Sequence, residues 1–420
     1  MTTAAPHADP AASRTPPSRL ARVLLPFALG YFLSYLYRVV NAVIGADLAR
    51  DLGVDAAALG LLTSAYFLCF AAFQIPLGVL LDRYGPRRVE SALLLVAAAG
   101  AVVFALAPSV PMLVVGRGLI GFGVSACLMG AIKANVQWLP PERLPLANGF
   151  IIAWGGLGAL TATVPVEAAL GVTDWRGVFL GLAAVTLAIA AAIFLVVPDA
   201  PGRPAGESWG AAFRDALRIF VQPQFLRVVP LSTLTQASFL AYNGLWAAPW
   251  LRDIAGLDRP GVAAVLAFGA AGILCGNLAM GFAADRLGRR GVTTLTVAVG
   301  GSIVYMALQG ALILGLPAPN ALMWFLFAVF GSGISLYYAA LSQAFDRRLA
   351  GRVNTAANMM VFAASFLLQW LIGEVLALWP AEAGGGIPAE AHTTVMAGIL
   401  ALEVLSLLWL WAAPRRRGTP

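Results

Sequence analysis

The sequence predicts an all-α membrane protein in which twelve transmembrane helices form two similar six-helix bundles. Three observations support this prediction: an apolar composition, twelve apolar stretches of helix length, and an internal repeat. Of the 420 residues, 60% are apolar and only 11% are charged, whereas soluble domains carry about 25% charged residues. A chain with so few charged side chains cannot coat a water-soluble core of this size, so a soluble enzyme is excluded.

The apolar stretches are long enough to cross a bilayer, because a hydrocarbon core of about 30 Å needs about 20 helical residues. They define an N-terminal bundle (20–198) and a C-terminal bundle (226–413), joined by a cytoplasmic linker (199–225) and flanked by polar tails (1–19 and 414–420). The first tail lacks the pattern of a signal peptide. We predict spans at 22–46, 57–81, 89–109, 111–137, 146–170, 176–198, 226–250, 260–283, 291–315, 320–345, 354–378 and 392–413.

Basic residues indicate the orientation of these spans. With the N-terminus inside, 20 arginines fall in cytoplasmic segments and four in outer ones, as the positive-inside rule requires. We therefore expect a multi-pass protein of the cell inner (plasma) membrane with both termini cytoplasmic. The net charge of +7 reflects these loops, so no nucleic-acid partner is expected. The three cysteines and two histidines show no metal-ligand spacing, and we predict no metal and no cofactor.

The two halves of the chain resemble each other. The run GVLLDRYGPRR (Gly78–Arg88) recurs as GFAADRLGRR (Gly281–Arg290) at an offset of 203, and three further matches occur in the same order in both halves at offsets of 202 to 210. Duplicated bundles are typical of transporters that bind substrate at the membrane midplane between the halves.

The duplicated element resembles the signature loop of the major facilitator superfamily, and the resemblance covers essentially the whole chain. It implies a secondary transporter that works by alternating access, without enzymatic activity. In that family the loop acts as a conformational latch, so Asp82, Arg83, Asp285 and Arg286 are predicted to gate the inner side. The alternative is that these charges only set the topology.

Arg38 is the main candidate for substrate binding. It lies 16 residues into the first predicted span, where a cation costs about 2.5–3.5 kcal/mol on insertion scales. A guanidinium group suits bidentate binding of a carboxylate or phosphate. The segment YLYRVVN (Tyr35–Asn41) is similar to the first span of the organic-anion and organophosphate branches. The alternative is a salt bridge from Arg38 to a carboxylate elsewhere in the bundle.

Lys133 is the only lysine in the chain and lies inside a predicted span. In the run KANVQWLPPER it resembles the basic residue that anion:cation symporters carry before a Trp-Phe-Pro-x-x-Glu-Arg sequence, with Leu139 in place of the Phe. The alternative is that Lys133 is an ordinary lysine at the inner end of its span, whose ammonium group reaches the membrane interface. The repeat places Gln343 and Leu240 at the positions equivalent to Lys133 and Arg38, so the predicted site is asymmetric.

Further candidates are polar or aromatic residues within spans. We expect Asn41 and Asn243, which the repeat relates, to face the cavity together, and Arg117 to reach the outer interface from a motif that resembles the family's fourth span. Arg117 then either anchors the helix or takes part in proton coupling. The predicted substrate contacts are Arg38, Lys133, Asn41, Tyr37, Gln74, Trp154, Asn243, Trp246, Tyr337 and Gln343, and the predicted proton-coupling residues are Glu374, Arg117 and Glu167.

The predicted function is proton-coupled transport of a small organic anion or zwitterion by a monomer, with the substrate, the proton and the bilayer as partners. The alternative is an exporter of a drug, siderophore or metabolite with the same fold. Span 5 lacks the Gly-Pro pair of the antiporter motif, which favours the first hypothesis. Nitrate is disfavoured as substrate because span 2 contains no arginine before Arg83.

Overall fold

Every secondary-structure element in the computed structural model, which describes residues 17–139, 144–198, 218–345, 350–380 and 386–413, is a helix. The predicted tails and linker fall largely outside these ranges. The first six spans are α1 (Pro17–Val39) with α2 (Asn41–Leu52), α3 (Ala56–Ala72) with α4 (Gln74–Tyr84), α5 (Pro86–Ala105), α6 (Val110–Gly123) with α7 (Cys127–Trp138), α8 (Leu144–Thr161) with α9 (Val164–Leu170), and α10 (Trp175–Val196).

The second six spans repeat this plan. They are α12 (Pro223–Ala241) with the π-helix η3 (Tyr242–Trp246) and α13 (Ala247–Asp253), α14 (Arg259–Gly288), α15 (Thr294–Ile313), α16 (Asn320–Gly331) with α17 (Ile334–Ala344), α18 (Ala350–Leu376), and α19 (Ala389–Ala412). Among the described residues, nine helices and two bent pairs are long and apolar enough to cross a membrane. The remaining predicted span corresponds to α12, η3 and α13.

The first two spans are broken near their centres. Each pair of helices bends by 44°, at Val40 in span 1 and at Phe73 in span 2. Pro76 explains the second break, because its ring nitrogen cannot donate a hydrogen bond to the carbonyl of Ala72. Span 1 also runs to Leu52, beyond the predicted end at 46, so this boundary was wrong. The breaks place Arg38 and Gln74 beside interrupted helix backbone.

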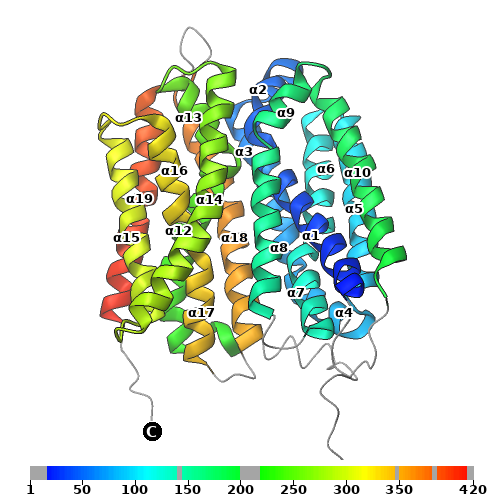
Figure 1. The fold of residues 1–420 in the computed structure, drawn as a ribbon. Coiled ribbons are helices and arrows are strands. Elements are labelled where there is room, and N and C mark those ends of the chain that lie inside the picture. Colours follow the sequence, from blue (N-terminus) through cyan, green and yellow to red (C-terminus); the bar gives the residue numbers. More distant parts are fainter. Residues whose placement is uncertain (1–16, 140–143, 199–217, 346–349, 381–385, 414–420) are drawn as a thin grey trace, which may run out of the picture.

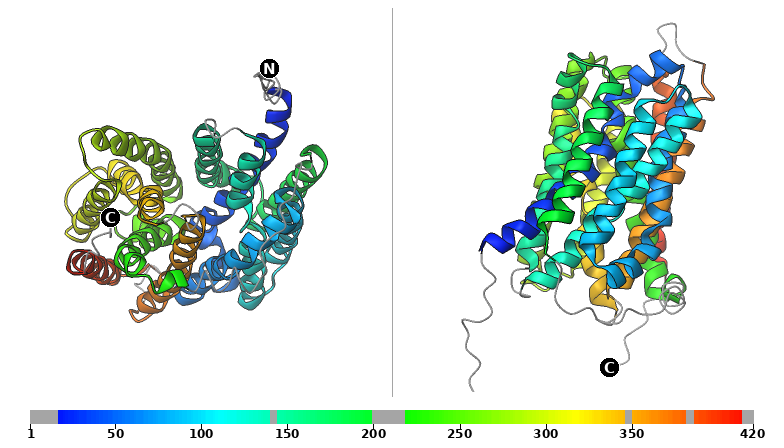
Figure 2. Two further views of the ribbon diagram at one scale, coloured as in Figure 1. Left: turned by 90° about the horizontal axis from the view of Figure 1, so that it is seen from below. Right: turned by 90° about the vertical axis from the view of Figure 1, so that its right-hand side faces the viewer.

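The two bundles lie side by side, with the N-terminal half in blue to green and the C-terminal half in yellow-green to red (Figure 1). The view from below shows the same division into two bundles (left panel of Figure 2). Following the charge prediction, we call the face that carries α2, α9 and α13 the outer face. The opposite face, near which α4, α7 and α17 lie in Figure 1, is the inner face.

Within the described residues, helices α3 and α18 form the most extensive contact between the halves. A methyl group added at Gly60 would lie 2.8 Å from the carbonyl oxygen of Gln369 and 3.2 Å from the Cα of Gly373. Small residues let helix backbones approach in a membrane. Further along the same pair, the rings of Phe70 and Phe362 are 4.1 Å apart between centroids. The halves are therefore tied together from the outer side down to the level of the breaks.

Candidate functional site

A small cavity of about 70 Å³ lies between the two halves at the level of the helix breaks, and we call it the central cavity. The N-terminal half contributes residues of α1, α3, α4 and α7, and the C-terminal half contributes residues of α12, α17 and α18. The lining residues are Tyr31, Ser34, Tyr35, Arg38, Phe70, Gln74, Ser125, Leu128, Met129, Gln236, Leu240, Ile334, Tyr338, Asn358, Val361 and Phe362.

Among the residues that the structure describes, Arg38 is the only charged one that lines this cavity. Its side chain is buried, with its guanidinium carbon 4.5 Å from the ring centroid of Tyr35 and 5.1 Å from that of Phe362. Within the described part of the chain, no carboxylate forms an ion pair with Arg38, and its Nε has no hydrogen-bond partner. Aromatic faces from both halves thus stabilise a cation that is still able to bind an anion.

The end of helix α1 also favours positive charge at this place. Arg38 lies in the last turn of α1, where the helix dipole is negative. Arg117 of α6 approaches the same helix end, because its Nη1 donates a 2.9 Å hydrogen bond to the carbonyl oxygen of Tyr37. Its guanidinium carbon lies 5.1 Å from the ring centroid of Tyr66. Two buried arginines therefore share the C-terminal end of a helix that stops within the membrane.

A chain of hydrogen bonds crosses the central cavity from one half to the other. Gln74 donates to the carbonyl oxygen of Ser125 at 3.4 Å and accepts from the amide of Asn358 at 3.3 Å. The hydroxyl of Tyr338 then donates to Asn358 Oδ1 at 2.8 Å. These neutral groups can both donate to and accept from a polar ligand beside Arg38.

Two of the ten predicted substrate contacts, Arg38 and Gln74, line the central cavity. The buried residues among the others face elsewhere. Tyr37 bonds to Thr186 at 2.9 Å, and Tyr337 bonds to Ser302 at 2.7 Å. The predicted pairing of Asn41 and Asn243 across the cavity is not present.

Asn41 donates to Thr63 within the N-terminal half, whereas Asn243 lines a separate small cavity inside the C-terminal bundle. Trp154 of α8 packs edge-on against Phe32 and Phe150. Gln343 is exposed at the end of α17, and the half-buried Lys133 of α7 is not part of the central lining. The predicted pair of basic residues is therefore not brought together in this cavity.

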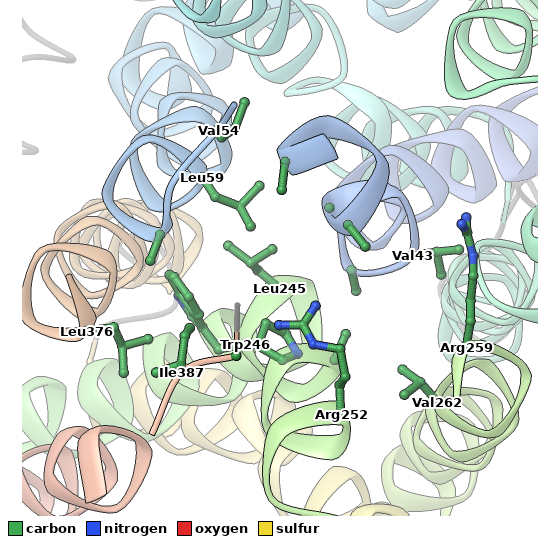
Figure 3. A pocket seen from close by; sticks show the side chains of 18 of the residues that line it. Val43, Val54, Leu59, Leu245, Trp246, Arg252, Arg259, Val262, Leu376 and Ile387 are labelled. Carbon is green, nitrogen blue, oxygen red and sulfur yellow. The ribbon is translucent and has the colours of Figure 1, made fainter. Parts of the chain in front are cut away.

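Trp246 lines a second and larger cavity of about 620 Å³ on the outer face, which we call the outer cavity. Figure 3 shows its mainly apolar walls, with Val54 and Leu59 facing Trp246 and Arg252. The indole Nε1 of Trp246 is buried and has no partner among the described residues. The outer cavity shares no lining residue with the central cavity.

An ion-pair cluster joins the two halves beside the outer cavity. Arg259 of α14 donates to both carboxylate oxygens of Asp47 on α2, at 2.9 and 2.6 Å. Its Nε also donates to Glu167 of α9 at 2.8 Å. Glu167, predicted as a proton-coupling residue, thus lies in a contact between the halves.

The structure places the other predicted coupling residues differently from our expectation. Arg117 does not reach the outer interface, because it is fully buried and bonded to the end of α1. Glu374 is exposed on α18, where it accepts a hydrogen bond from Trp370 at 2.8 Å, so it does not lie in a low-dielectric cavity.

The predicted gating residues lie at the inner ends of spans 2 and 8. Arg83 and Arg286 are exposed, and Asp285 forms a 2.7 Å ion pair with Arg289 of its own half. The side chain of Asp82 lies outside the described part of the structure.

Several lining residues were not predicted. Tyr31, Ser34 and Tyr35 precede Arg38 at the spacing of one helical face, i, i+3, i+4 and i+7, and this periodicity could have identified them. Glu90 of α5 was also missed. Its carboxyl group is fully buried, and neither oxygen has a hydrogen-bond partner within the described chain.

Comparison with known proteins identifies the family. The model of the Major Facilitator Superfamily matches residues 27–368. This protein belongs to the major facilitator superfamily. It is accordingly a multi-pass membrane transporter and not an enzyme, which confirms the predicted fold class.

Individual relatives and structures agree with this assignment. The chain is 31% identical over 165 residues to a probable sulfoacetate transporter (SauU) of Cupriavidus necator, across 39% of this chain and 38% of that protein. It is 24% identical to a probable nitrate/nitrite antiporter (NarK1) of Thermus thermophilus, across 94% and 91%. The fold matches a bacterial homologue of the human lysosomal transporter Spinster, with a TM-score of 0.74 at 18% identity over 95% and 98% of the two chains.

Proposed function

We propose that this protein transports a small organic anion across the cell inner membrane, with both termini in the cytoplasm. Arg38 binds the anion in the central cavity, and the two halves expose this cavity to each side in turn. The observation that carries the proposal is a buried guanidinium group that has aromatic neighbours but no carboxylate partner among the described residues.

The surroundings of Arg38 suit an anion with a short organic body. The guanidinium group offers several N–H donors to a carboxylate, sulfonate or phosphate, and Tyr338 and Asn358 add neutral polar groups from the other half. Phe70 and Phe362 provide an apolar wall. Because the cavity measures about 70 Å³, substrate entry requires the halves to separate on one side.

The names of the relatives support an anionic substrate. One is a probable transporter of sulfoacetate, which is an organic anion, and another is a probable nitrate/nitrite antiporter. We favour the organic anion, because Arg38 is the only basic residue in the described part of the central lining. We further propose that a proton accompanies the substrate. Lys133 remains a predicted substrate contact, although it does not line the central cavity.

The test uses purified protein in proteoliposomes loaded with unlabelled sulfoacetate, into which labelled sulfoacetate exchanges. Hydrogen bonds to a charged group contribute about 1.5–3 kcal/mol. The substrate concentration that gives half-maximal exchange should therefore rise by roughly 10- to 100-fold in Arg38→Gln. Arg38→Lys keeps the charge but loses the bidentate geometry and should have an intermediate effect. Arg22→Gln, which alters an exposed arginine of the same helix, is the control.

Exchange that survives Arg38→Gln at the rate of the Arg22→Gln control would refute the anion site. Exchange of labelled nitrate, but not of labelled sulfoacetate, would replace the organic anion with an inorganic one. Exchange of cationic dyes, but of neither anion, would favour the exporter hypothesis.

A further inference from the structure

Glu90 presents an unusual environment for a carboxyl group. It lies in the second turn of α5, is fully buried, and has no hydrogen-bond partner for either oxygen within the described chain. Glu403, the buried glutamate of the C-terminal bundle, provides a contrast. It accepts hydrogen bonds from Ser238 and Gln309, each at 2.5 Å. The buried glutamate of the C-terminal bundle therefore has hydrogen-bond donors, whereas that of the N-terminal bundle has none among the described residues.

Two glycines create the space that Glu90 occupies. A methyl group added at Gly30 of α1 would collide with Oε1 of Glu90, and one added at Gly130 of α7 would collide with Oε2. The carboxyl group thus lies between α5 and the backbones of two other helices. Glycine within a helix costs about 1 kcal/mol relative to alanine, so this space is maintained at a cost in stability.

An ionised carboxylate is poorly accommodated in this space. Burying a charge without a donor or a counter-ion costs several kcal/mol, whereas the neutral acid avoids most of this cost. Acidic residues inside transmembrane segments commonly serve ion or proton movement. The geometry around Glu90 is therefore that of a group that carries a proton in this conformation.

Among the described residues, no cation forms an ion pair with Glu90. The thiol of Cys127 on α7 lies beside the carboxyl group and within electrostatic range of Arg38. A thiol is a weak donor and here lacks hydrogen-bond geometry. The other titratable or charged residues on the neighbouring helices are Arg19, Arg22, Tyr31, Tyr35, Tyr37 and Arg38 on α1, Asp82, Arg83 and Tyr84 on α4, Arg87 and Arg88 on α5, Arg117 on α6, Lys133 on α7 and Arg176 on α10.

We infer that Glu90 is the proton-binding residue that couples proton movement to anion transport. This inference rests on the proposed function. The carboxylate takes up one proton from water on one side of the membrane, forming an O–H bond, and releases it to water on the other side. The proton is the only species transferred, so no further reactant is needed.

Charge balance within the N-terminal bundle gives the direction of coupling. With Glu90 protonated, the positive charge of Arg38 is uncompensated and favours a bound anion. With Glu90 ionised, its negative charge offsets part of the positive charge of Arg38 and Arg117 in a medium of low dielectric constant, so the bundle interior attracts an anion less strongly. Proton and anion therefore bind more favourably together than separately, which is symport.

The first test compares two assays in proteoliposomes with sulfoacetate as the probe. In Glu90→Gln we expect exchange within about threefold of wild type but at least a tenfold loss of accumulation driven by a proton gradient. Glu90→Met, which fits a space without hydrogen-bond partners, should behave in the same way and serves if the Gln variant folds poorly. Glu390→Gln, at an exposed position of α19, is the control and should retain both activities.

Accumulation at the wild-type level in either Glu90 variant would overturn the inference, as would loss of exchange in both variants when they fold normally. A second measurement is independent of the substrate. The infrared spectrum of wild type minus Glu90→Gln at neutral pH should contain the carbonyl band of a protonated carboxylic acid. A carboxylate band in its place overturns the inference even if sulfoacetate is not transported. The acid band together with absent transport of every anion refutes only the proposed function.

Discussion

The ion pairs of Arg259 offer a direct test of how the outer face is held closed. Arg259→Gln removes a bidentate contact to Asp47 and a second contact to Glu167, both of which cross from one half to the other. The substitution leaves the two carboxylates in place. We therefore expect the halves to separate more readily at the outer face.

The degree of burial sets the expected magnitude. The side chain of Arg259 is 36% exposed, and those of Asp47 and Glu167 are 11% and 20% exposed. Exposed ion pairs contribute about 0–1 kcal/mol, and breaking buried ones costs about 3–5 kcal/mol. This half-exposed cluster should contribute about 1–3 kcal/mol, which corresponds to a shift of roughly 5- to 150-fold in the conformational equilibrium.

The assay is a distance distribution between spin labels on the two halves. Suitable positions are Val172 after α9 and Leu314 after α15, which are 91% and 74% exposed on the outer side. The native cysteines are first replaced. In Arg259→Gln the population with the longer distance should rise, and accumulation of substrate should fall because the closed state becomes too rare.

Arg252 provides the matched control. It also borders the outer cavity, but its carboxylate partner, Asp253 at 2.8 Å, belongs to the same half. Arg252→Gln should therefore leave the distance distribution unchanged. If Arg252→Gln and Arg259→Gln alter the distribution equally, or if neither does, the cluster does not close the outer face.

Two glycine substitutions follow from the same helix contacts. Gly60→Ala places a methyl group 2.8 Å from a backbone oxygen of α18 and should increase the outward-separated population measured with the same label pair; an unchanged distribution would contradict this. Gly158→Ala forces a methyl group against the carbonyl oxygen of Phe32, and overpacking of this kind costs about 1–3 kcal/mol. Its melting temperature should fall, whereas Gly181→Ala, in the interior of α10 with open space around it, should melt at or above the wild-type temperature because alanine favours the helix.

Much of the fold could be predicted because membrane insertion depends on properties that are read along the chain. Each of the twelve predicted spans corresponds to one helix or to consecutive short helices, since apolar length and loop charge are linear features. The breaks at Val40 and Phe73 were not predicted. Only the second has a proline nearby, and the structure gives no comparable cause for the first.

The site was less predictable, because neighbouring residues on a helix point about 100° apart. Tyr37 was predicted to contact substrate, but Tyr35 lines the central cavity instead. On α17, Tyr337 was predicted, but its neighbour Tyr338 lines the cavity. The prediction that Arg117 reaches the outer interface was wrong for a different reason. Its depth was counted along the sequence, but the carbonyl of Tyr37 that it binds exists as an acceptor only because α1 stops inside the membrane.

The asymmetry predicted from the repeat has a mechanical consequence in the structure. Leu240, the counterpart of Arg38, also lines the central cavity, so the charge lies on the N-terminal wall alone. Arg38 nevertheless contacts Phe362 of the other half through its guanidinium face. An anion bound to the edge of that group leaves the face free, because hydrogen bonds to a guanidinium lie in its plane. Substrate binding is therefore compatible with contact between the halves, and a bound anion reduces the cost of burying Arg38 when they close over it.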